Sequence, residues 1–274
     1  MPRPGKRKNG VLDSKTRTHE EQLAAAVELN CGEWLRLKGR LPWVELHDEK
    51  DALWIFAGDT YPGNSAALAR FTPASALGRI GEILERHLEH KAACNWIVGP
   101  ASQPADLDRH LKANGFSCRI HCAGMACDLD SLGLAPPVPA GVRIELLDTP
   151  LSLNPLSTAR RKRRLEGRTL MAQFTPRMIW NFSAQVDGVP VGETTLLAAE
   201  RTAGIYDVEV KEEFRGRGIG TALIDAAVRQ AKKLGYVAVV LGATGMGSRV
   251  YAKVGFREVG KLSFWKYGKM RQLR

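Results

Sequence analysis

The most informative segment of this chain is residues 205–221, IYDVEVKEEFRGRGIGT. A strand-like apolar segment runs into a turn rich in glycine and arginine, and residues 221–234 beyond it have the apolar period of a helix. Glycines let backbone N–H groups approach a ligand without a Cβ in the way. The first turn of a helix has free N–H donors and a partial positive charge, which favour phosphate. We therefore predict a phosphate-binding turn, to which Arg215 and Arg217 add full charges.

Two common phosphate-binding motifs do not fit this turn. A Walker A loop has the pattern G-x-x-x-x-G-K-[ST], and no such lysine follows these glycines. A dinucleotide fingerprint requires Gly or Ala where the chain has Thr221 or Leu223. The pattern that remains is R-x-x-G-x-G, formed by Arg215, Gly218 and Gly220. On the turn alone, a purely structural role for these residues stays open.

The segments around the turn alternate strands and helices. The dipeptide Asp187-Gly188 separates apolar segments at 183–186 and 189–197, which predicts a two-residue hairpin. Further strands are predicted at 203–210, 237–241 and 262–267, and helices at 221–234 and 247–254. This order of elements predicts an α/β (α+β) fold with a sheet of mixed pairing.

The chain divides at a segment rich in proline and glycine. Residues 133–141, GLAPPVPAG, contain three prolines and two glycines and cannot continue a helix or a central strand. We predict four parts: a disordered basic tail (1–18), a first domain (19–132), this linker (133–141) and a second domain (142–274).

The two domains contain an internal repeat. Residues 106–116, DLDRHLKANGF, resemble residues 246–256, MGSRVYAKVGF, at an offset of 140 positions. Each copy follows an apolar strand, and a helix precedes each strand. Two copies of one fold therefore explain the chain better than two unrelated domains.

The turn and residues 249–256, RVYAKVGF, together resemble the GNAT superfamily of N-acetyltransferases. The turn is similar to the family's acyl-CoA motif, and the second segment is similar to its "LYxKxGF". The resemblance covers essentially all of 142–274, with both motifs in the expected order. It implies two tandem GNAT-like domains, each a mixed, mostly antiparallel sheet flanked by helices. It also implies acetyl-CoA (coenzyme A) as the co-substrate of an N-acetyltransferase, without a metal.

The resemblance assigns roles within the second domain. In that family, the strand before the turn splays from its neighbour at a bulge. The main chain of Val208 and Val210 would pair with the pantetheine arm. Tyr251 would protonate the leaving thiolate. The alternative is that Tyr251 is only a packed aromatic residue. The pyrophosphate would be held by Arg215, Gly216, Arg217, Gly218, Ile219, Gly220 and Thr221.

The first copy departs from this pattern. Residues 76–81, ALGRIG, replace the arginine–glycine turn, and Leu111 stands where the second copy has Tyr251. We therefore predict that the first domain is degenerate, keeps the fold, and does not bind CoA.

Direct attack on a thioester requires a neutral amine and hence a proton acceptor. All six histidines and all five cysteines precede the linker, so a base in the second domain must be a carboxylate, a tyrosine or a water. The missing thiol also favours direct attack over a ping-pong route. Gly204 occupies the position where some family members place a catalytic Glu.

The nearest carboxylates to that position are Asp207 and Glu209. Strict alternation along a strand places them on the face opposite Tyr206 and Val208, and a bulge would change this. We predict that Asp207 is the base or an acceptor-binding group, and Glu209 is the second candidate. The alternative is that both are ordinary polar residues of the strand. The run 206–208 also resembles the Tyr-Asp-Leu of some aminoglycoside 3-N-acetyltransferases, which implies a small cationic amine as acceptor.

Charge is unevenly distributed along the chain. Residues 19–141 hold 11 basic and 16 acidic side chains, whereas residues 142–274 hold 23 and 12. We expect the acidic first domain to wall the acceptor cleft and to suit a cationic amine. The five cations at 160–164 predict a solvated helix face. The alternatives are that they bind RNA or a ribosome, or that they attract CoA.

The apolar runs and the cysteines of the chain limit the cellular compartment in which we expect the protein. No run of about 18 apolar residues exists, which excludes a membrane-spanning helix. Five cysteines without metal-ligand spacing predict reduced thiols in a cytoplasmic protein. The alternative to an enzyme is an acyl-CoA-binding or nucleic-acid-binding protein. The acceptor's identity and the oligomeric state stay open.

Overall fold

The structure is a computed structural model of the full chain and describes residues 18–59, 63–153, 158–200, 202–245 and 247–267. The predicted tail lies outside these residues except for Thr18. Thr18 caps the first helix, α1 (His19–Lys38), in a capping box with Glu21. Within the described residues, no helix is long and apolar enough to span a bilayer.

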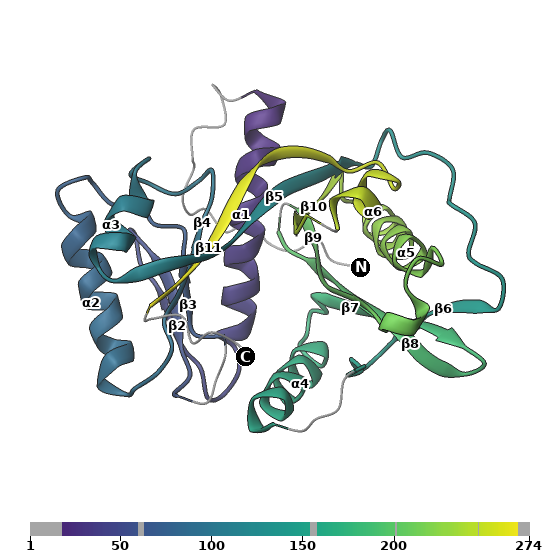
Figure 1. The fold of residues 1–274 in the computed structure, drawn as a ribbon, viewed down its shortest axis with the longest axis horizontal. Helices are drawn as coiled ribbons and strands as arrows, with labels where there is room; N and C mark the ends of the chain where they lie inside the picture. Colours follow the sequence, from purple (N-terminus) through teal and green to yellow (C-terminus); the bar gives the residue numbers. More distant parts are fainter. Residues whose placement is uncertain (1–17, 60–62, 154–157, 201, 246, 268–274) are drawn as a thin grey trace.

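One sheet of eleven strands runs through both halves of the chain (Figure 1). Its order is β1-β2-β3-β4-β11-β5-β10-β9-β8-β7-β6, and the pairs β3–β4 and β9–β10 are parallel while the other pairs are antiparallel. The strands before the linker are β1 (Glu45–Asp48), β2 (Leu53–Phe56), β3 (Ser65–Ala67), β4 (Asn95–Val98) and β5 (Phe116–Asp128). The strands after it are β6 (Val142–Leu147), β7 (Ile179–Val186), β8 (Val189–Ala198), β9 (Ala203–Val210), β10 (Ala238–Ala243) and β11 (Arg257–Tyr267). The predicted mixed, mostly antiparallel sheet is confirmed.

The helices repeat in the two halves. In the first half, residues up to 132, α1 is followed by α2 (Ala76–Glu89) and α3 (Leu107–Ala113). In the second half, residues from 142, α4 (Ala159–Ala172), α5 (Ile219–Lys233) and α6 (Ser248–Ala252) stand in the corresponding places, with a 3₁₀ turn at Glu212–Phe214. The parallel contact of β3 with β4 spans two residue pairs, as does that of β9 with β10. The predicted internal repeat therefore extends to the pairing of strands.

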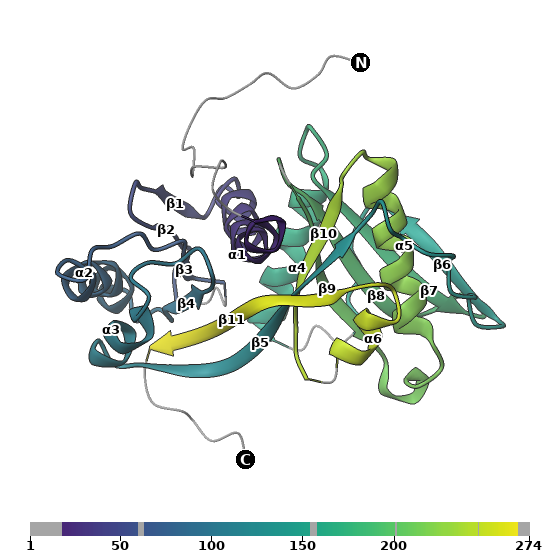
Figure 2. The same cartoon turned by 90° about the horizontal axis from the view of Figure 1, so that it is seen from above.

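The two halves exchange their last strands. Strand β5 of the first half pairs with β10 from Asp128 to Ala123, and β11 of the second half lies between β4 and β5. Figures 1 and 2 show β5 and β11 side by side across the centre of the molecule. The linker at 133–141 divides the sequence, but the sheet continues across the two halves.

Local sequence explains the boundaries of several elements. Asp187 and Gly188 have φ values of 49° and 75°, as the predicted hairpin between β7 and β8 requires. Gly235, with φ of 85°, follows the end of α5. Helix α5 buries its apolar face against β7, β8 and β9, whereas Leu23 and Val27 of α1 pack with Val240 of β10. Helix α1 thus belongs to the core shared by both halves.

The exchange predicts that a residue near the C-terminus stabilises the first half. Trp265 of β11 is buried among Trp96, Leu111 and Phe116 of the first half. Trp265→Ala should lower the free energy of unfolding by about 3–5 kcal/mol, because it leaves a cavity in that core. Denaturant titration followed by circular dichroism measures the change. Lys261→Ala, at an exposed position of the same strand, should stay within about 0.5 kcal/mol of the parent. A loss below about 1 kcal/mol for Trp265→Ala would contradict the exchange.

Candidate active site

Strand β9 separates from β10 shortly after it begins. The two strands pair at Ala203–Val239 and Gly204–Val240, and β9 then continues to Val210 paired with β8 on its other side. The β10-facing edge of β9 is therefore open to a ligand along its second part. Such an edge presents backbone N–H and C=O groups that an extended ligand can pair with.

A β-bulge lies in this part of β9. Glu193 of β8 opposes Glu209 and Thr195 opposes Tyr206, so that Asp207 and Val208 together face one residue of β8. Asp207 has a φ of 53°, a left-handed conformation that a non-glycine residue adopts at some cost.

The bulge changes the faces on which the side chains lie. Val208 and Val210 pack toward the core beneath α5, whereas Tyr206 packs with residues of α1 and α4. Asp207 lines a cavity with residues of the same two helices. Strict alternation, which separates Asp207 from Tyr206, is therefore wrong here, because the extra residue puts both on one face.

The predicted phosphate turn connects β9 to α5. Gly216 and Gly218 have φ values of 76° and 83°, which favour glycine, and Gly218 is the N-cap of α5 without a capping side chain. The N–H groups of the first helical turn are thus left without a side-chain cap. Arg215 and Arg217 are exposed beside them, and the Arg215 Nε donates to the Val210 carbonyl at 3.1 Å. The turn is open to solvent and carries positive charge.

Tyr251 lies on α6, half-buried, with its ring 6.1 Å from that of Phe256. Burial raises its pKa above the ordinary value of tyrosine, because it disfavours the phenolate, and the Cys122 thiol adds to this. The hydroxyl therefore keeps its proton at neutral pH and can act as a donor. A Cβ on Gly247 would come within 2.7 Å of the Tyr251 ring, so the glycine lets the ring lie where it does.

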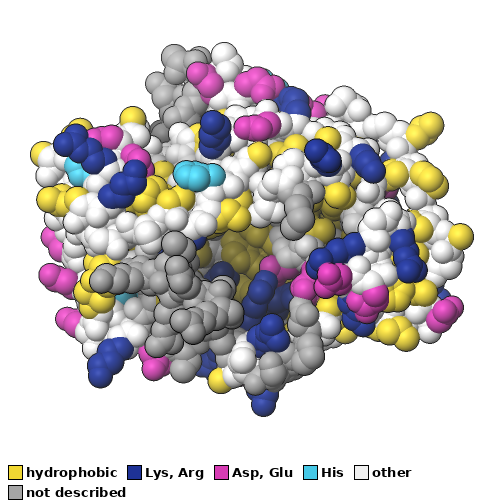
Figure 3. Space-filling model, in the orientation of Figure 1, with side chains coloured by type: hydrophobic (Ala, Val, Ile, Leu, Met, Phe, Trp, Pro, Cys, Tyr) yellow, Lys and Arg dark blue, Asp and Glu magenta, His cyan; other side chains and the backbone are white. Residues whose placement is uncertain are grey.

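A cavity of about 240 Å³ lies between the two halves. Its lining includes Trp34 and Lys38 of α1, Arg164, Arg168 and Met171 of α4, and Asp207 of the β9 bulge. Figure 3 shows this face of the molecule hollowed between the halves, with Lys and Arg side chains beside the hollow.

Three ion pairs join α4 to the sheet at this cavity. Arg168 donates to Glu193 at 3.3 Å and to the Thr195 hydroxyl at 3.1 Å, and the Arg168 and Glu193 side chains are 7% and 6% exposed. Burial raises the pKa of Glu193, and Arg168 opposes this rise. Arg164 pairs with Asp207, and the Arg168 Nε lies 3.7 Å from the same carboxylate.

Sequence reasoning missed Glu193, Arg168 and Lys38. A glutamate inside the apolar strand 189–197 could have been noticed, since a buried charge requires a partner. Nothing local marks Lys38, which comes from the first half. Burial lowers its pKa to about 8, against the opposing influence of Asp207, and its ammonium lies 5.7 Å from the centre of the Trp34 ring.

Helix α1, which carries Lys38, also explains why glycine occupies position 204. A Cβ on Gly204 would lie 1.8 Å from the Asn30 Oδ1 of α1. That oxygen accepts from the Tyr206 hydroxyl at 2.7 Å, and the Asn30 amide donates to the Thr202 carbonyl at 2.9 Å. The Tyr206 ring also stacks on Trp34, with centroids 4.7 Å apart. Asn30 of the first half therefore occupies the space that a side chain at position 204 would need.

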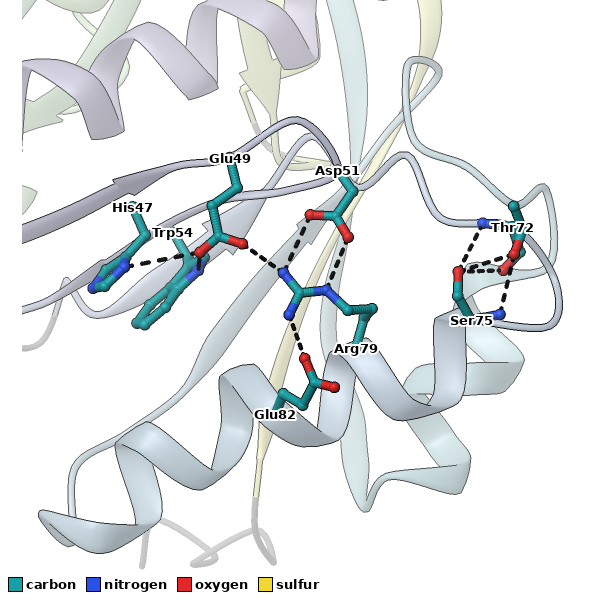
Figure 4. Close-up of polar contacts among 8 residues, drawn as sticks. All are labelled: His47, Glu49, Asp51, Trp54, Thr72, Ser75, Arg79 and Glu82. Carbon is teal, nitrogen blue, oxygen red and sulfur yellow. Dashed lines mark hydrogen bonds and ion pairs between the residues drawn. The ribbon is translucent and has the colours of Figure 1, made fainter.

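The corresponding turn of the first half is built differently (Figure 4). Arg79 of α2 binds three carboxylates, those of Glu49, Asp51 and Glu82. At the start of the same helix, the N–H of Ser75 donates to the Thr72 hydroxyl at 3.1 Å. Acidic groups and intramolecular hydrogen bonds thus surround the helix start that corresponds to the phosphate turn.

The basic run at 160–164 is partly directed inward. Arg163 lies 3.8 Å from the centre of the Trp43 ring and pairs with Glu166, while Arg164 pairs with Asp207. The side chain of Arg160 lies outside the described residues. Arg161, Lys162 and Arg164 are nevertheless exposed and Arg163 is half-buried, so the described part of the run agrees with the predicted solvated helix face.

Residues 150–256 match the model of the acetyltransferase (GNAT) family. The chain carries a GNAT-family domain. An uncharacterized N-acetyltransferase of Methanocaldococcus jannaschii is 35% identical over 94 residues, which are 31% of this chain and 42% of that protein. The mycothiol acetyltransferase of Propionibacterium freudenreichii subsp. shermanii is 34% identical over 83 residues, 29% of this chain and 23% of that one. The chain thus spans less than half of either relative's length.

Solved structures extend the likeness of fold beyond the GNAT match. A GCN5-related N-acetyltransferase from Kribbella flavida has a TM-score of 0.67 at 16% identity and covers 90% of this chain and 97% of its own. A tandem GNAT protein from the clavulanic acid biosynthesis pathway has a TM-score of 0.56 at 18% identity, covering 90% and 98%. The predicted GNAT fold class is confirmed. The structural similarity to these proteins also covers the first half of the chain.

The contact between Gly204 and Asn30 gives a testable coupling. Gly204→Ala should lower the free energy of unfolding by about 1–3 kcal/mol, because its methyl group overlaps the Asn30 amide. Asn30→Ala should reduce that penalty by removing the obstacle. A double-mutant cycle measured by chemical denaturation gives the coupling energy. Gly78→Ala, in an exposed helix with no atom within 4 Å of the new Cβ, is the matched control and should not destabilise. Strictly additive effects of the Gly204 and Asn30 changes would contradict the contact.

Proposed function

We propose that this protein is an acetyl-CoA-dependent N-acetyltransferase that acetylates an amine acceptor by direct attack. The observation that carries the proposal is a strand with an open edge running into an arginine–glycine turn at a helix start. An open β9 edge suits the amides of a pantetheine arm. The turn after it suits a pyrophosphate, and both motifs belong to a GNAT-family domain.

The residues of the second half would hold the co-substrate as follows. The main chain of Val208 and Val210 pairs with the pantetheine arm along the edge that β10 leaves free. Residues 215–221 hold the pyrophosphate through their N–H groups, with the charges of Arg215 and Arg217 beside it. The positive φ of Gly216 and Gly218, and their exposure, support this assignment.

Tyr251 is proposed to give its proton to the sulfur that leaves. Its raised pKa supports this role, since the hydroxyl is protonated over the whole neutral range. When bound, acetyl-CoA supplies a thioester carbonyl for the amine to attack.

The two predicted carboxylates differ in their surroundings. Asp207 lines the cavity, and its oxygens face Arg164 and Arg168. We assign to Asp207 the acceptor-site role of holding these guanidinium groups in place, and the amine's proton passes to water. Glu209 lies opposite Glu193 in the strand register, nearer the turn, and remains the second candidate for a proton acceptor.

The lining of the cavity does not favour the predicted cationic acceptor. Among its described residues, the first half contributes Trp34, Lys38 and Gly63 rather than the expected acidic wall. Carboxylates of that half instead pair with arginines such as Arg79 and Arg86. Cations at the cavity would repel an aminoglycoside-type antibiotic, so the proposed acceptor is a small amine of lower positive charge.

Release of thiol from acetyl-CoA separates an enzyme from a binding protein. An enzyme forms free thiol only when the right amine is supplied, whereas an acyl-CoA-binding or nucleic-acid-binding protein retains the ligand without releasing thiol. A panel of amines with a chromogenic thiol reagent makes this measurement.

Titration of the full chain with CoA should give one site per chain, because acidic groups surround the corresponding helix start in the first half. Gly218→Asp should lower the affinity at least roughly 100-fold, since it puts a negative charge against the phosphates. Isothermal calorimetry measures both quantities. Gly235→Asp, at a glycine with φ of 85° beyond the other end of α5, is the control and should bind CoA normally. Unchanged affinity in folded Gly218→Asp, or two sites per chain, would refute the assignment.

Tyr251→Phe should lower kcat roughly 10²-fold, because it removes a positioned proton donor while keeping the ring. Binding of acetyl-CoA should change little. Tyr267→Phe serves as the control, since that ring packs on Phe116 away from the turn. A near-normal kcat for Tyr251→Phe would contradict the proton-donor role and leave Tyr251 as a packing residue.

A further inference from the structure

Lys38 lines the cavity and has no carboxylate partner among the residues that the structure describes. Among the described residues, no carboxylate lies within ion-pairing distance of its ammonium group, which lies 5.7 Å from the centre of the Trp34 ring. The side chain is half-buried at the end of α1, in a hollow between the two halves.

The other cations of the cavity are balanced. Arg168 is paired with Glu193, which lies behind it in the sheet, and Arg164 is paired with Asp207. Two guanidinium groups thus meet two carboxylates, and the charge of Lys38 is left over. A half-desolvated ammonium without a partner is unfavourable, and the same desolvation lowers its pKa.

A ligand with an anionic group would supply the missing partner. Trp34 and Met171 give the cavity an apolar wall for the hydrocarbon part of such a ligand. Its volume of about 240 Å³ lies below the roughly 300–1,000 Å³ of sites for drug-sized ligands, which fits a small molecule.

We propose that the acceptor is a small amine that also carries a carboxylate, such as an amino acid, and that Lys38 binds this carboxylate. The proposal rests on the proposed transferase function and adds a substrate class to it. In the reaction the bond between the acetyl carbon and sulfur breaks and a bond from that carbon to nitrogen forms. The amine loses one proton to water, and the thiolate gains one from Tyr251, which is reprotonated from solvent.

The first experiment compares acceptors that differ in one group. Amino acids, β-alanine and γ-aminobutyrate are each assayed for thiol release beside their own carboxamides, with spermidine and kanamycin as cationic probes. The best acid should exceed its amide roughly ten- to hundredfold in kcat/KM, the effect of one charge-assisted hydrogen bond. Amides or polycations used as well as the acids would overturn the proposal.

The second experiment removes the charge of Lys38. Lys38→Met should raise KM for the best acid roughly ten- to hundredfold with little change in kcat, while the affinity for acetyl-CoA stays unchanged. Activity with the matching amide should not fall, and Lys38→Arg should recover part of the loss with the acid. Lys50→Met, at an exposed position before β2, is the matched control and should resemble the parent. An equal KM for the acid in Lys38→Met and the parent would overturn the proposal.

A binding measurement separates this proposal from the transferase proposal. The same acids and amides are titrated into the CoA-loaded full chain by calorimetry, with the parent and with Lys38→Met. Lys38-dependent binding of acids without thiol release would support the carboxylate site and refute the transferase. Thiol release with amines that need no carboxylate would support the transferase and overturn the carboxylate site. If the parent neither binds nor acetylates any of the acids, the carboxylate site is likewise overturned.

Discussion

The fold is organised around the antiparallel pairing of β5 with β11. This pairing spans most of both strands, from Tyr267 against Phe116 to Arg257 against Ala126. Because β5 continues into pairing with β10 and β11 into pairing with β4, each half completes its sheet with a strand of the other. Separation of the halves would break three strand ladders, β4–β11, β11–β5 and β5–β10, and expose apolar side chains such as Trp265. The two halves are therefore held together by backbone hydrogen bonds as well as by side-chain packing.

This constraint explains how a half without the phosphate-binding turn still shapes the candidate site. The exchanged strands hold α1 against both halves, so that Leu23 and Val27 pack with Val240 of β10. The same helix then brings Asn30 to Gly204, Trp34 to Tyr206 and Lys38 to the cavity. The start of α2, where a second cofactor would lie by analogy, is instead surrounded by carboxylates bound to Arg79. The first copy supplies one wall of the site of the second.

Charges at the cavity follow from what burial permits. Arg168 and Glu193 are almost fully buried, which is tolerable because each is the other's partner and Thr195 adds a hydrogen bond. The bulge at Asp207 brings a second carboxylate to the same face, where Arg164 binds it. Within the described part of the chain Lys38 has no such partner, and this asymmetry, rather than the net charge of either half, describes the environment that an acceptor would meet.

The strand, turn and helix around residues 203–234, the hairpin at Asp187-Gly188 and the repeat could all be predicted from the sequence. These are local features, in which the period of apolar residues and the conformational freedom of glycine act over a few neighbouring positions. The exchange of β5 and β11 and the composition of the cavity were decided by tertiary structure alone. Tyr206 and Asn30 are hydrogen-bonded although 176 positions apart, and no local pattern specifies such a contact. Alternation along β9 failed at Asp207 for a related reason, since a bulge depends on the register with the neighbouring strand. The charge counts of the two halves likewise predicted an acidic wall for the cleft that the structure does not have. Carboxylates of the first half are bound by its own arginines, and its charged residue at the cavity is Lys38.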